Sequence, residues 1–257
     1  MGFTTLGVVL MAVYVALTLL APLVLSRPRL LVRHPQLGLR LWMASFTLAA
    51  LSITFALGLF IALALRHHVV HVDGHDTVGP LIDQLLGWLA IAAIGILAFR
   101  MGVAVQDART AVATMTGEFA PLLARATHIT VGNRELWVVD SSVALMGARS
   151  GRVIATSAVI ALLDETQLAA VVEHEHTHVA QHHARVLAIA NIGEAIAPSM
   201  TAGQGFASAA RITTELIADD VAAQRFGAGE TARALELAYP LAPGVSERVA
   251  RLRSRAS

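Results

Sequence analysis

Long apolar runs without charged residues constrain this chain more than any other feature of its sequence. Leu6–Leu25 and Leu41–Leu65 contain no charged residue, and Pro80–Val105 carries only Asp83 and Arg100, both toward its ends. About 20 apolar residues in a helix can cross the roughly 30 Å hydrocarbon core of a bilayer. We therefore predict three membrane helices. A cleaved signal peptide is the alternative for the first run, but that run is long for one and no Lys or Arg precedes it.

Overall composition agrees with a membrane location and limits the metal ligands and partners that the chain can have. Charged residues make up 14% of the chain, well below the roughly 25% of an ordinary soluble domain. The net charge of +1 gives no reason to expect a nucleic-acid partner. Cysteine is absent, which excludes disulfides and thiolate metal sites and leaves histidine and carboxylate groups as the strong metal ligands.

The loops between the expected helices indicate the orientation. Four arginines lie in Ser26–Arg40, whereas Arg66–Gly79 has one. Because basic loop residues concentrate on the cytoplasmic side, we expect the first loop inside the cell and the second outside. The sequence thus predicts a multi-pass protein of the inner (plasma) membrane, with a membrane region at 1–105 and a cytoplasmic domain at 106–257.

The chemistry centres on a short histidine-rich segment. His174, Glu175 and His178 form the pattern HExxH, which on a helix places two imidazoles one turn apart on one face. Two such nitrogens can bind one zinc ion, while the neighbouring carboxylate can take a proton from bound water. Asp164 followed by Gln167 is a typical N-terminal capping pair, so we expect a helix here. The alternative is an ordinary helix with a histidine-rich polar face.

Glu215 and Asp219 offer the remaining protein groups. They lie one turn apart in Ala210–Phe226, a segment of helical composition that Gly227 ends. Glu215 can be the third zinc ligand, and Asp219 can accept a hydrogen bond from the far nitrogen of a ligating histidine. Two histidines, one glutamate and one water make a catalytic zinc set. An acidic pair on a solvated helix is the competing interpretation.

These motifs carry a family resemblance. The pattern His174–His178, preceded by Gln167–Glu173 and followed by Glu215–Asp219, resembles the BlaR/MecR-like family of membrane zinc metallopeptidases. HtpX-like membrane proteases share both motifs and are the nearest competitor. Ala144–Ser157 is similar to the strand pair that precedes the zinc helix in the BlaR/MecR-like family, and Val245–Leu252 is similar to its closing helix.

The resemblance implies roles for individual residues. His174, His178 and Glu215 would be zinc ligands, Glu175 the general base, and Asp219 the supporting carboxylate. It also implies a zincin-like α+β domain of the gluzincin type attached to a membrane helical bundle, with a protein or peptide as substrate, such as a regulatory repressor. Antibiotic-sensing members carry an external penicillin-binding domain that does not appear in this sequence, so we do not expect a direct β-lactam sensor.

Short β-branched runs precede the zinc-helix segment: His128–Val131, Leu136–Asp140, Val143–Met146 and Arg152–Thr156. Gly132 and other turn residues separate them, which predicts a small antiparallel sheet. An edge strand beside the zinc could hold an extended substrate through main-chain hydrogen bonds. Equally, the strands could serve only to close the core.

The segment between the two zinc motifs bears on topology. Val186–Met200 is apolar but short for a membrane span. A single crossing there would place Glu215 on the opposite side from His174 and His178, so we expect a buried, interfacial or re-entrant segment. We expect Ala202–Gly205 to be a flexible loop.

Several polar groups have no assigned role. No Gly or Pro interrupts the zinc helix before Gly193, so His182 is expected on the same face as His178. His182, Arg211 and Tyr239 are candidates for polarising a substrate carbonyl.

The tail, Glu230–Ser257, is expected to be one or two helices broken at Pro240 and Pro243. Its arginines either keep the terminus soluble or contact anionic lipid: Arg248, Arg251, Arg253 and Arg255. The loop with His67, His68, His71 and His75 is either a metal or pH sensor or a hydrated connector.

The sequence therefore favours an integral membrane zinc endopeptidase that contacts the bilayer and a protein substrate. A membrane signalling or scaffold protein that binds the metal without cleaving is the main alternative. A metal-handling protein that uses the outer-loop histidines is a third hypothesis.

Overall fold

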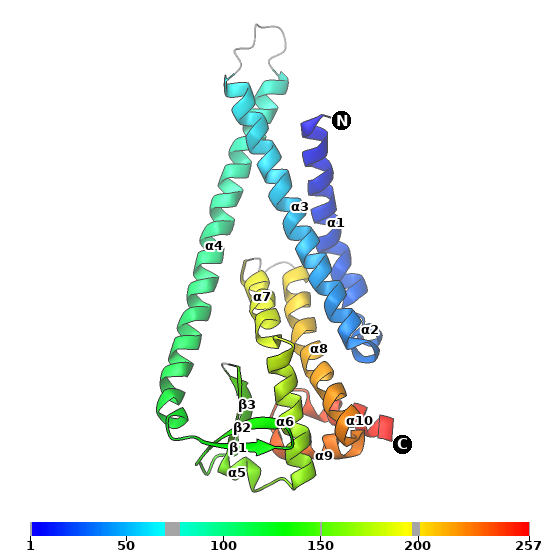
Figure 1. Ribbon diagram of the computed structural model, residues 1–257. Helices are drawn as coiled ribbons and strands as arrows, with labels where there is room; N and C mark the ends of the chain where they lie inside the picture. The colour runs from blue at the N-terminus through cyan, green and yellow to red at the C-terminus, as the bar shows by residue number, and fades with distance from the viewer. Residues whose placement is uncertain (1, 70–77, 150, 197–200, 257) are drawn as a thin grey trace. The chain divides into compact units, whose positions relative to one another are not determined.

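The computed structural model describes residues 2–69, 78–149, 151–196 and 201–256 (Figure 1). His71 and His75 of the predicted outer loop lie outside the described residues, and so do the side chains of His67 and His68. The sensor hypothesis for this loop therefore stays a prediction.

The chain divides into two compact units that are each discontinuous in sequence. The first contains Met1–Ala108 and Ile189–Ala210, and the second contains Arg109–Ala188 and Arg211–Ser257. The candidate zinc ligands His174, His178 and Glu215 belong to the second unit. The functional division into a membrane region at 1–105 and a peptidase domain at 106–257 stays a prediction.

Four helices precede the sheet: α1 Phe3–Leu25, α2 Pro28–Arg33, α3 Pro35–Val69 and α4 Val78–Leu123. Three stretches of them are long and apolar enough to cross a membrane: Phe3–Leu25, Pro35–Arg66 and Leu81–Thr110. The predicted set of three apolar helices is confirmed. They are longer than predicted because the helical backbone continues beyond the apolar residues, and α4 runs without a break to Leu123.

The first unit exposes large apolar side chains on these helices. Leu23 of α1 is 70% exposed, Phe55 of α3 is 63% exposed and Phe99 of α4 is 73% exposed. Soluble proteins rarely leave such extended apolar surfaces in water. Lipid hydrocarbon would cover them, so the unit has the surface of a membrane-anchored protein.

Helix α7 (His183–Ile196) contributes its residues from Ile189 on to the first unit, and α8 (Thr201–Phe226) contributes its residues up to Ala210. A Cβ atom at Gly193 would lie only 2.8 Å from the Phe46 ring and would collide with it. Phe206 packs against the same Phe46 ring, with ring centroids 5.1 Å apart. The glycine thus allows α7 to lie close to α3, and of the described helices neither α7 nor α8 is a candidate span.

The prediction of a flexible loop at Ala202–Gly205 is wrong, because these residues lie in the first turns of α8. A Cβ at Gly205 would lie 3.0 Å from the ring of Trp42, and one at Gly203 would lie 3.0 Å from the carbonyl oxygen of Gly193. The glycines therefore permit close helix packing. A pair of glycines in the sequence does not show whether they allow close helix packing or form a flexible loop.

The second unit contains a four-stranded sheet with the order β1-β2-β4-β3. Its strands are β1 Thr127–Val131, β2 Arg134–Val139, β3 Met146–Arg149 and β4 Arg152–Thr156. Two hairpins, β1-β2 and β3-β4, are antiparallel, and Gly132 and Gly151 supply the positive φ of their turns.

The prediction of an antiparallel sheet needs one correction, because β2 and β4 pair in parallel and the sheet is mixed. The third strand also begins later than predicted. Leu145 donates its backbone N–H to the Thr156 hydroxyl and accepts the Thr156 N–H, which holds the preceding residues in a loop. That loop carries the chain past β4 to the sheet edge, so β3 returns beside β4 and the central pair becomes parallel.

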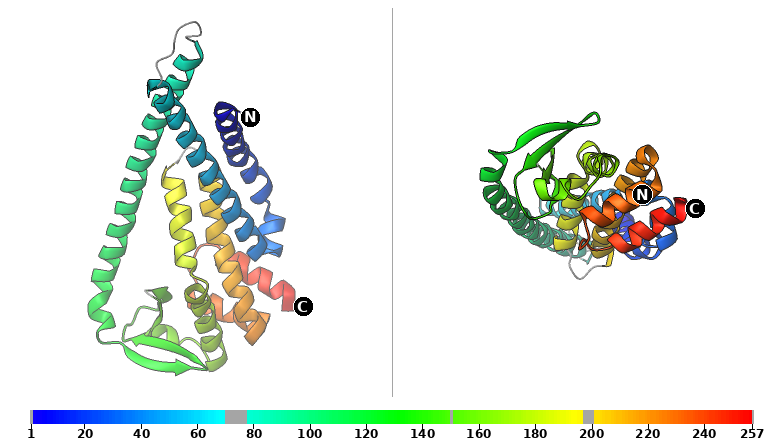
Figure 2. Two further views of the ribbon diagram at one scale, coloured as in Figure 1. Left: turned by 45° about the horizontal axis from the view of Figure 1, so that its top comes forward. Right: turned by 90° about the horizontal axis from the view of Figure 1, so that it is seen from below.

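The zinc-helix segment forms α6, Glu165–Ala180, after the short helix α5, Ser157–Ile160. It packs against the sheet and against α9 (Ala228–Ala238) in one core (Figure 2). The buried apolar residues of that core are mostly small or branched: Leu136, Met146, Val153, Ala155, Val159, Ala170, Val171, Val172, Ala234 and Ala238. The final helix, α10 (Val245–Ala256), packs on α9 through Leu235, Val249 and Leu252. The tail is thus two helices, and Pro240 and Pro243 lie in the segment between them.

Candidate metal centre

The HExxH motif lies on a well-capped helix. The carboxylate of Asp164 accepts the backbone N–H of Gln167 at 2.8 Å, and the Gln167 side chain accepts the N–H of Asp164 at 3.2 Å. This reciprocal pair is the predicted capping box. One turn separates His174 from His178 in α6, and their Nε2 atoms lie 3.2 Å apart.

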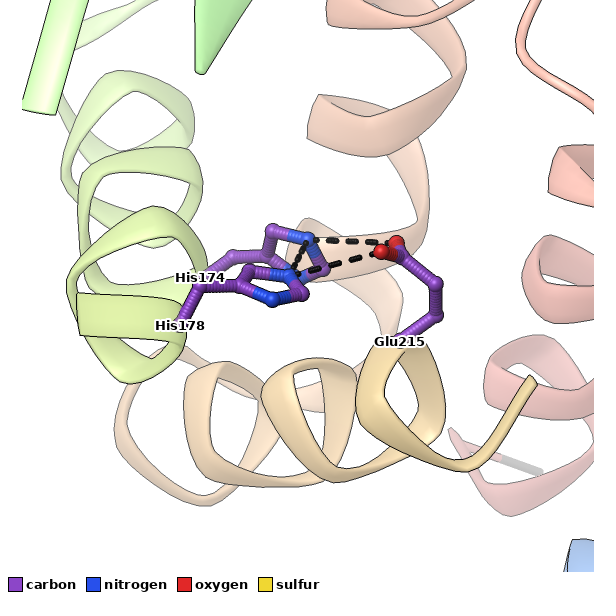
Figure 3. A group of neighbouring side chains, drawn as sticks. All are labelled: His174, His178 and Glu215. Atoms are coloured by element: carbon purple, nitrogen blue, oxygen red, sulfur yellow. Dashed lines mark hydrogen bonds and ion pairs between the residues drawn. The ribbon is translucent and has the colours of Figure 1, made fainter. Parts of the chain in front are cut away.

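Helix α8 brings Glu215 to the two histidines. Its carboxylate oxygens lie 3.6 Å from Nε2 of His174 and 3.5 Å from Nε2 of His178. Figure 3 shows the three side chains pointing toward one another from α6 and α8, and one ligand atom from each lies within 4.8 Å of the others.

These spacings fit a zinc ion. Ligand atoms about 2.1 Å from a tetrahedral zinc lie about 3.4 Å from one another. The observed separations of 3.2, 3.5 and 3.6 Å match that edge length. Two imidazoles and a carboxylate are also a set of ligands that binds zinc. The residues present therefore suit the metal.

Asp219 lies behind the first histidine, where the sequence predicted a supporting carboxylate. Its Oδ1 is 3.1 Å from Nδ1 of His174, and both side chains are buried. The approach is oblique, so Nδ1 has no aligned hydrogen-bond partner among the described residues. A proton on Nδ1 facing this carboxylate leaves the lone pair on Nε2, the atom that faces Glu215.

The second histidine contacts His183, a residue that sequence reasoning left without a role. Nδ1 of His183 lies 3.0 Å from Nδ1 of His178. Helix α6 ends at Ala180, and His182 has a φ of 53°. The prediction that His182 continues the face of His178 is therefore wrong, because the left-handed residue breaks the helix and turns His183 inward instead.

The charges around the centre favour a protonated His174 in the metal-free protein. Burial opposes a charge on this imidazole, but the contacts with Asp219 and Glu215 prevail and raise the pKa of His174 to about 9. Burial likewise opposes ionisation of both carboxyl groups, yet His174 and Arg248 lower the pKa of Glu215, and of Asp219, to about 2. Burial and the charge on His174 lower the pKa of His178 to about 4.

Zinc binding is expected to release about one proton per ion near pH 7.5. His174 carries that proton below its raised pKa, while His178 is already neutral. The release should fade above about pH 10, where His174 is neutral before zinc binds. Calorimetric titration in buffers of different ionisation enthalpy measures the number of protons directly. A binding enthalpy that does not depend on the buffer at pH 7.5 would contradict the assignment.

Glu175 is buried beside the donor set and contacts a residue of the C-terminal region. The hydroxyl of Tyr239, at the end of α9, donates a short hydrogen bond to Oε1 of Glu175. Burial and the neighbouring Glu175 raise the pKa of Tyr239 well above its usual range, so the phenol is a neutral donor. The Tyr239 and His174 rings lie 6.1 Å apart between centroids. Of the candidates for polarising a carbonyl, Tyr239 is thus at the centre, whereas His182 and Arg211 are exposed.

An ion-pair network around the buried Glu173 anchors the zinc helix next to the ligands. Glu173 accepts two hydrogen bonds from Arg134 of β2, at 2.9 and 3.0 Å, and one from Arg225 of α8, at 2.6 Å. The network connects the sheet, α6 and α8 at the residue that precedes His174. One sequence cannot pair such distant positions, so sequence reasoning missed it.

The arginines of the tail make ion pairs that the sequence did not predict. Arg248 contacts Asp219 and Glu215, and Arg251 contacts Asp220. Arg253 and Arg255 pair with Glu236 and Asp220. These side chains form ion pairs within the second unit, because α10 packs beside the acidic face of α8. Helical spacing could have shown that Arg248 and Arg251 share a face, but not which face meets it.

Two helices bring two histidines and a glutamate together, and the first of them, α6, packs on a small sheet. Residues 144–256 match the model of Peptidase family M48. Neither a curated protein nor a solved structure matches the chain. The family match supports a zinc metallopeptidase family, the level at which the BlaR/MecR-like and HtpX-like resemblances agree. Combined with the three helices of membrane-spanning length, it supports a membrane metallopeptidase.

Proposed function

We propose that this protein is an integral membrane zinc endopeptidase. One observation carries the proposal: three donor atoms from His174, His178 and Glu215 lie at the spacing of a zinc ligand set, and Glu175 lies on α6 with the two histidines. A purely structural zinc site has no use for a carboxylate base at that position.

Each residue has a defined part in peptide hydrolysis. Bound zinc would supply the Lewis acidity that activates water and the scissile carbonyl. Glu175 takes a proton from the attacking water and passes it to the leaving amine. The second proton of the water also ends on the amine, so that a peptide bond and a water molecule become a carboxylate and a protonated amine. Tyr239 donates to Glu175 and fixes the direction of that carboxylate. Asp219 holds His174 in the required tautomer.

We further propose that the catalytic domain faces the cytoplasm and that its substrate is a protein at or near the inner leaflet. The arginine-rich first loop supports this orientation. By family resemblance, a transcriptional repressor or another regulatory protein is the proposed kind of substrate. The bilayer is the other proposed partner, and the near-neutral net charge argues against nucleic acid.

Metal removal tests the proposed function. Purified protein in detergent should hydrolyse an unstructured protein such as casein, or cleave itself. A chelator should abolish cleavage, and stoichiometric zinc should restore it, because the three ligands form one site. Zinc binding without any hydrolysis would favour the signalling or scaffold alternative. Loss of the metal on replacing His67 together with His71, with His174 intact, would favour the metal-handling hypothesis.

A further inference from the structure

A buried arginine of the C-terminal helix contacts both acidic residues of the centre. Arg248 of α10 is 9% exposed, although arginine is almost never buried without a partner. Its Nε and Nη2 donate to the two carboxylate oxygens of Asp219 at 2.8 and 2.6 Å. Its Nη1 lies 2.7 Å from Oε2 of Glu215. One guanidinium therefore binds both carboxylates that α8 brings to the metal centre.

The guanidinium of Arg248 stabilises the ionised forms of both Glu215 and Asp219. Glu215 must be ionised to bind a metal, and Asp219 must be ionised to hold His174. Like charges one helical turn apart repel each other, and burial makes both harder to ionise. The planar fork of Arg248 offers several N–H donors at once, so one positive charge serves both carboxylates.

The hydrogen bonds of Arg248 also determine which carboxylate oxygens of Glu215 and Asp219 face the histidines. Because Nη1 of Arg248 occupies Oε2 of Glu215, Oε1 is left on the side of His178, 3.5 Å from its Nε2. Oδ1 of Asp219 is shared between Nη2 of Arg248 at 2.6 Å and Nδ1 of His174 at 3.1 Å. A shift of Arg248 would therefore move one ligand directly and a second through Asp219.

We infer that Arg248 is a positioning residue of the metal centre, so that metal affinity depends on the docking of α10. The inference rests on the metal site of the proposed function. It assigns the C-terminal helix a direct part in metal binding, beyond its part in closing the core.

The same helix offers a matched control. Arg251 also makes two hydrogen bonds to one carboxylate: its Nη1 and Nη2 donate to Asp220 at 2.8 and 3.0 Å. The side chains of Arg248 and Arg251 are both 10% exposed. Asp220 is the chain neighbour of Asp219 but lies outside the candidate ligand set. Removing either arginine should weaken the packing of α10, whereas only Arg248 should matter to the metal.

The test measures zinc affinity of the full chain in detergent by competition with a chromophoric chelator, alongside thermal unfolding. Arg248→Met is expected to lower zinc affinity about 10- to 100-fold, the range for groups that support metal ligands. Arg251→Met should keep the wild-type affinity, although it also removes an arginine that docks α10. Arg248→Lys, which keeps the charge but not the planar fork, should fall between Arg248→Met and the wild type.

A double variant shows whether the effect passes through the paired carboxylate. If Arg248 acts partly through Asp219, Asp219→Asn should lower zinc affinity less in the Arg248→Met background than in the wild type. Full additivity of the two losses would contradict that route. Should Arg248→Met fail to fold, Arg248→Lys against Arg251→Lys makes the same comparison.

Equal zinc affinity for Arg248→Met, Arg251→Met and the wild type would overturn the inference. A wild type that binds no zinc would overturn both the inference and the proposed function. Zinc that binds, weakens in the Arg248 variant only and supports no hydrolysis in any variant would leave the inference standing and remove the peptidase assignment.

Discussion

Glutamine in place of Glu175 is expected to reduce peptide hydrolysis about 10²- to 10⁴-fold, the usual contribution of a general acid or base. The amide keeps the size of the carboxylate and can still accept the hydrogen bond from Tyr239, but it cannot take a proton from water. Glu175 is not part of the zinc ligand set, so the metal should remain bound at wild-type stoichiometry. Steady-state kinetics and metal analysis of the same preparation provide the two measurements.

A neighbouring residue supplies the control for this substitution. His176 lies on α6 next to Glu175, but its Nε2 contacts Arg134 at 3.2 Å instead of the donor set. His176→Gln should therefore keep most of the activity. Equal activity of Glu175→Gln and the wild type would remove the catalytic assignment, and zinc loss in Glu175→Gln would show that the carboxylate also supports the ligands.

Sequence reasoning worked best where the relevant contacts are local. The capping pair at Asp164 and the four-residue spacing of His174 and His178 depend on helix periodicity, which one sequence reveals. Glu215 and Asp219 follow the same periodicity in a second helix, and metal chemistry related the two helices. These residues therefore came together as expected, although their roles stay proposals.

The remaining features depend on contacts between distant segments. Tyr239 reaches the centre because α9 packs on α6, and Arg248 reaches it because α10 forms ion pairs with α8. His183 reaches it because His182 adopts a left-handed conformation. None of these events leaves a periodic signal. The parallel pairing of β2 with β4 is equally non-local, since hairpin turns specify only the neighbouring strands.

Removing the Asp219 carboxylate is expected to have the largest effect on folding stability. Asp219 is completely buried and binds Arg248 through both oxygens. Asp219→Ala leaves the guanidinium with Glu215 as its remaining carboxylate partner in this contact, and breaking a buried pair typically costs about 3–5 kcal/mol. The same change leaves Nδ1 of His174 without its carboxylate, so zinc affinity should also fall, by about 10- to 100-fold.

Asp220→Ala is the control that shows whether the loss of stability in Asp219→Ala comes from this buried contact or from losing any negative charge on α8. Asp220 also pairs with arginine, but its side chain is 20% exposed and water can solvate the groups left behind. Denaturation in detergent should therefore show a much smaller destabilisation for Asp220→Ala, with unchanged zinc affinity. Similar losses in both variants would mean that the acidic face of α8 acts only as a docking surface for α10. A loss confined to Asp219→Ala would tie the stability of the C-terminal helices to the same carboxylate that orients a metal ligand.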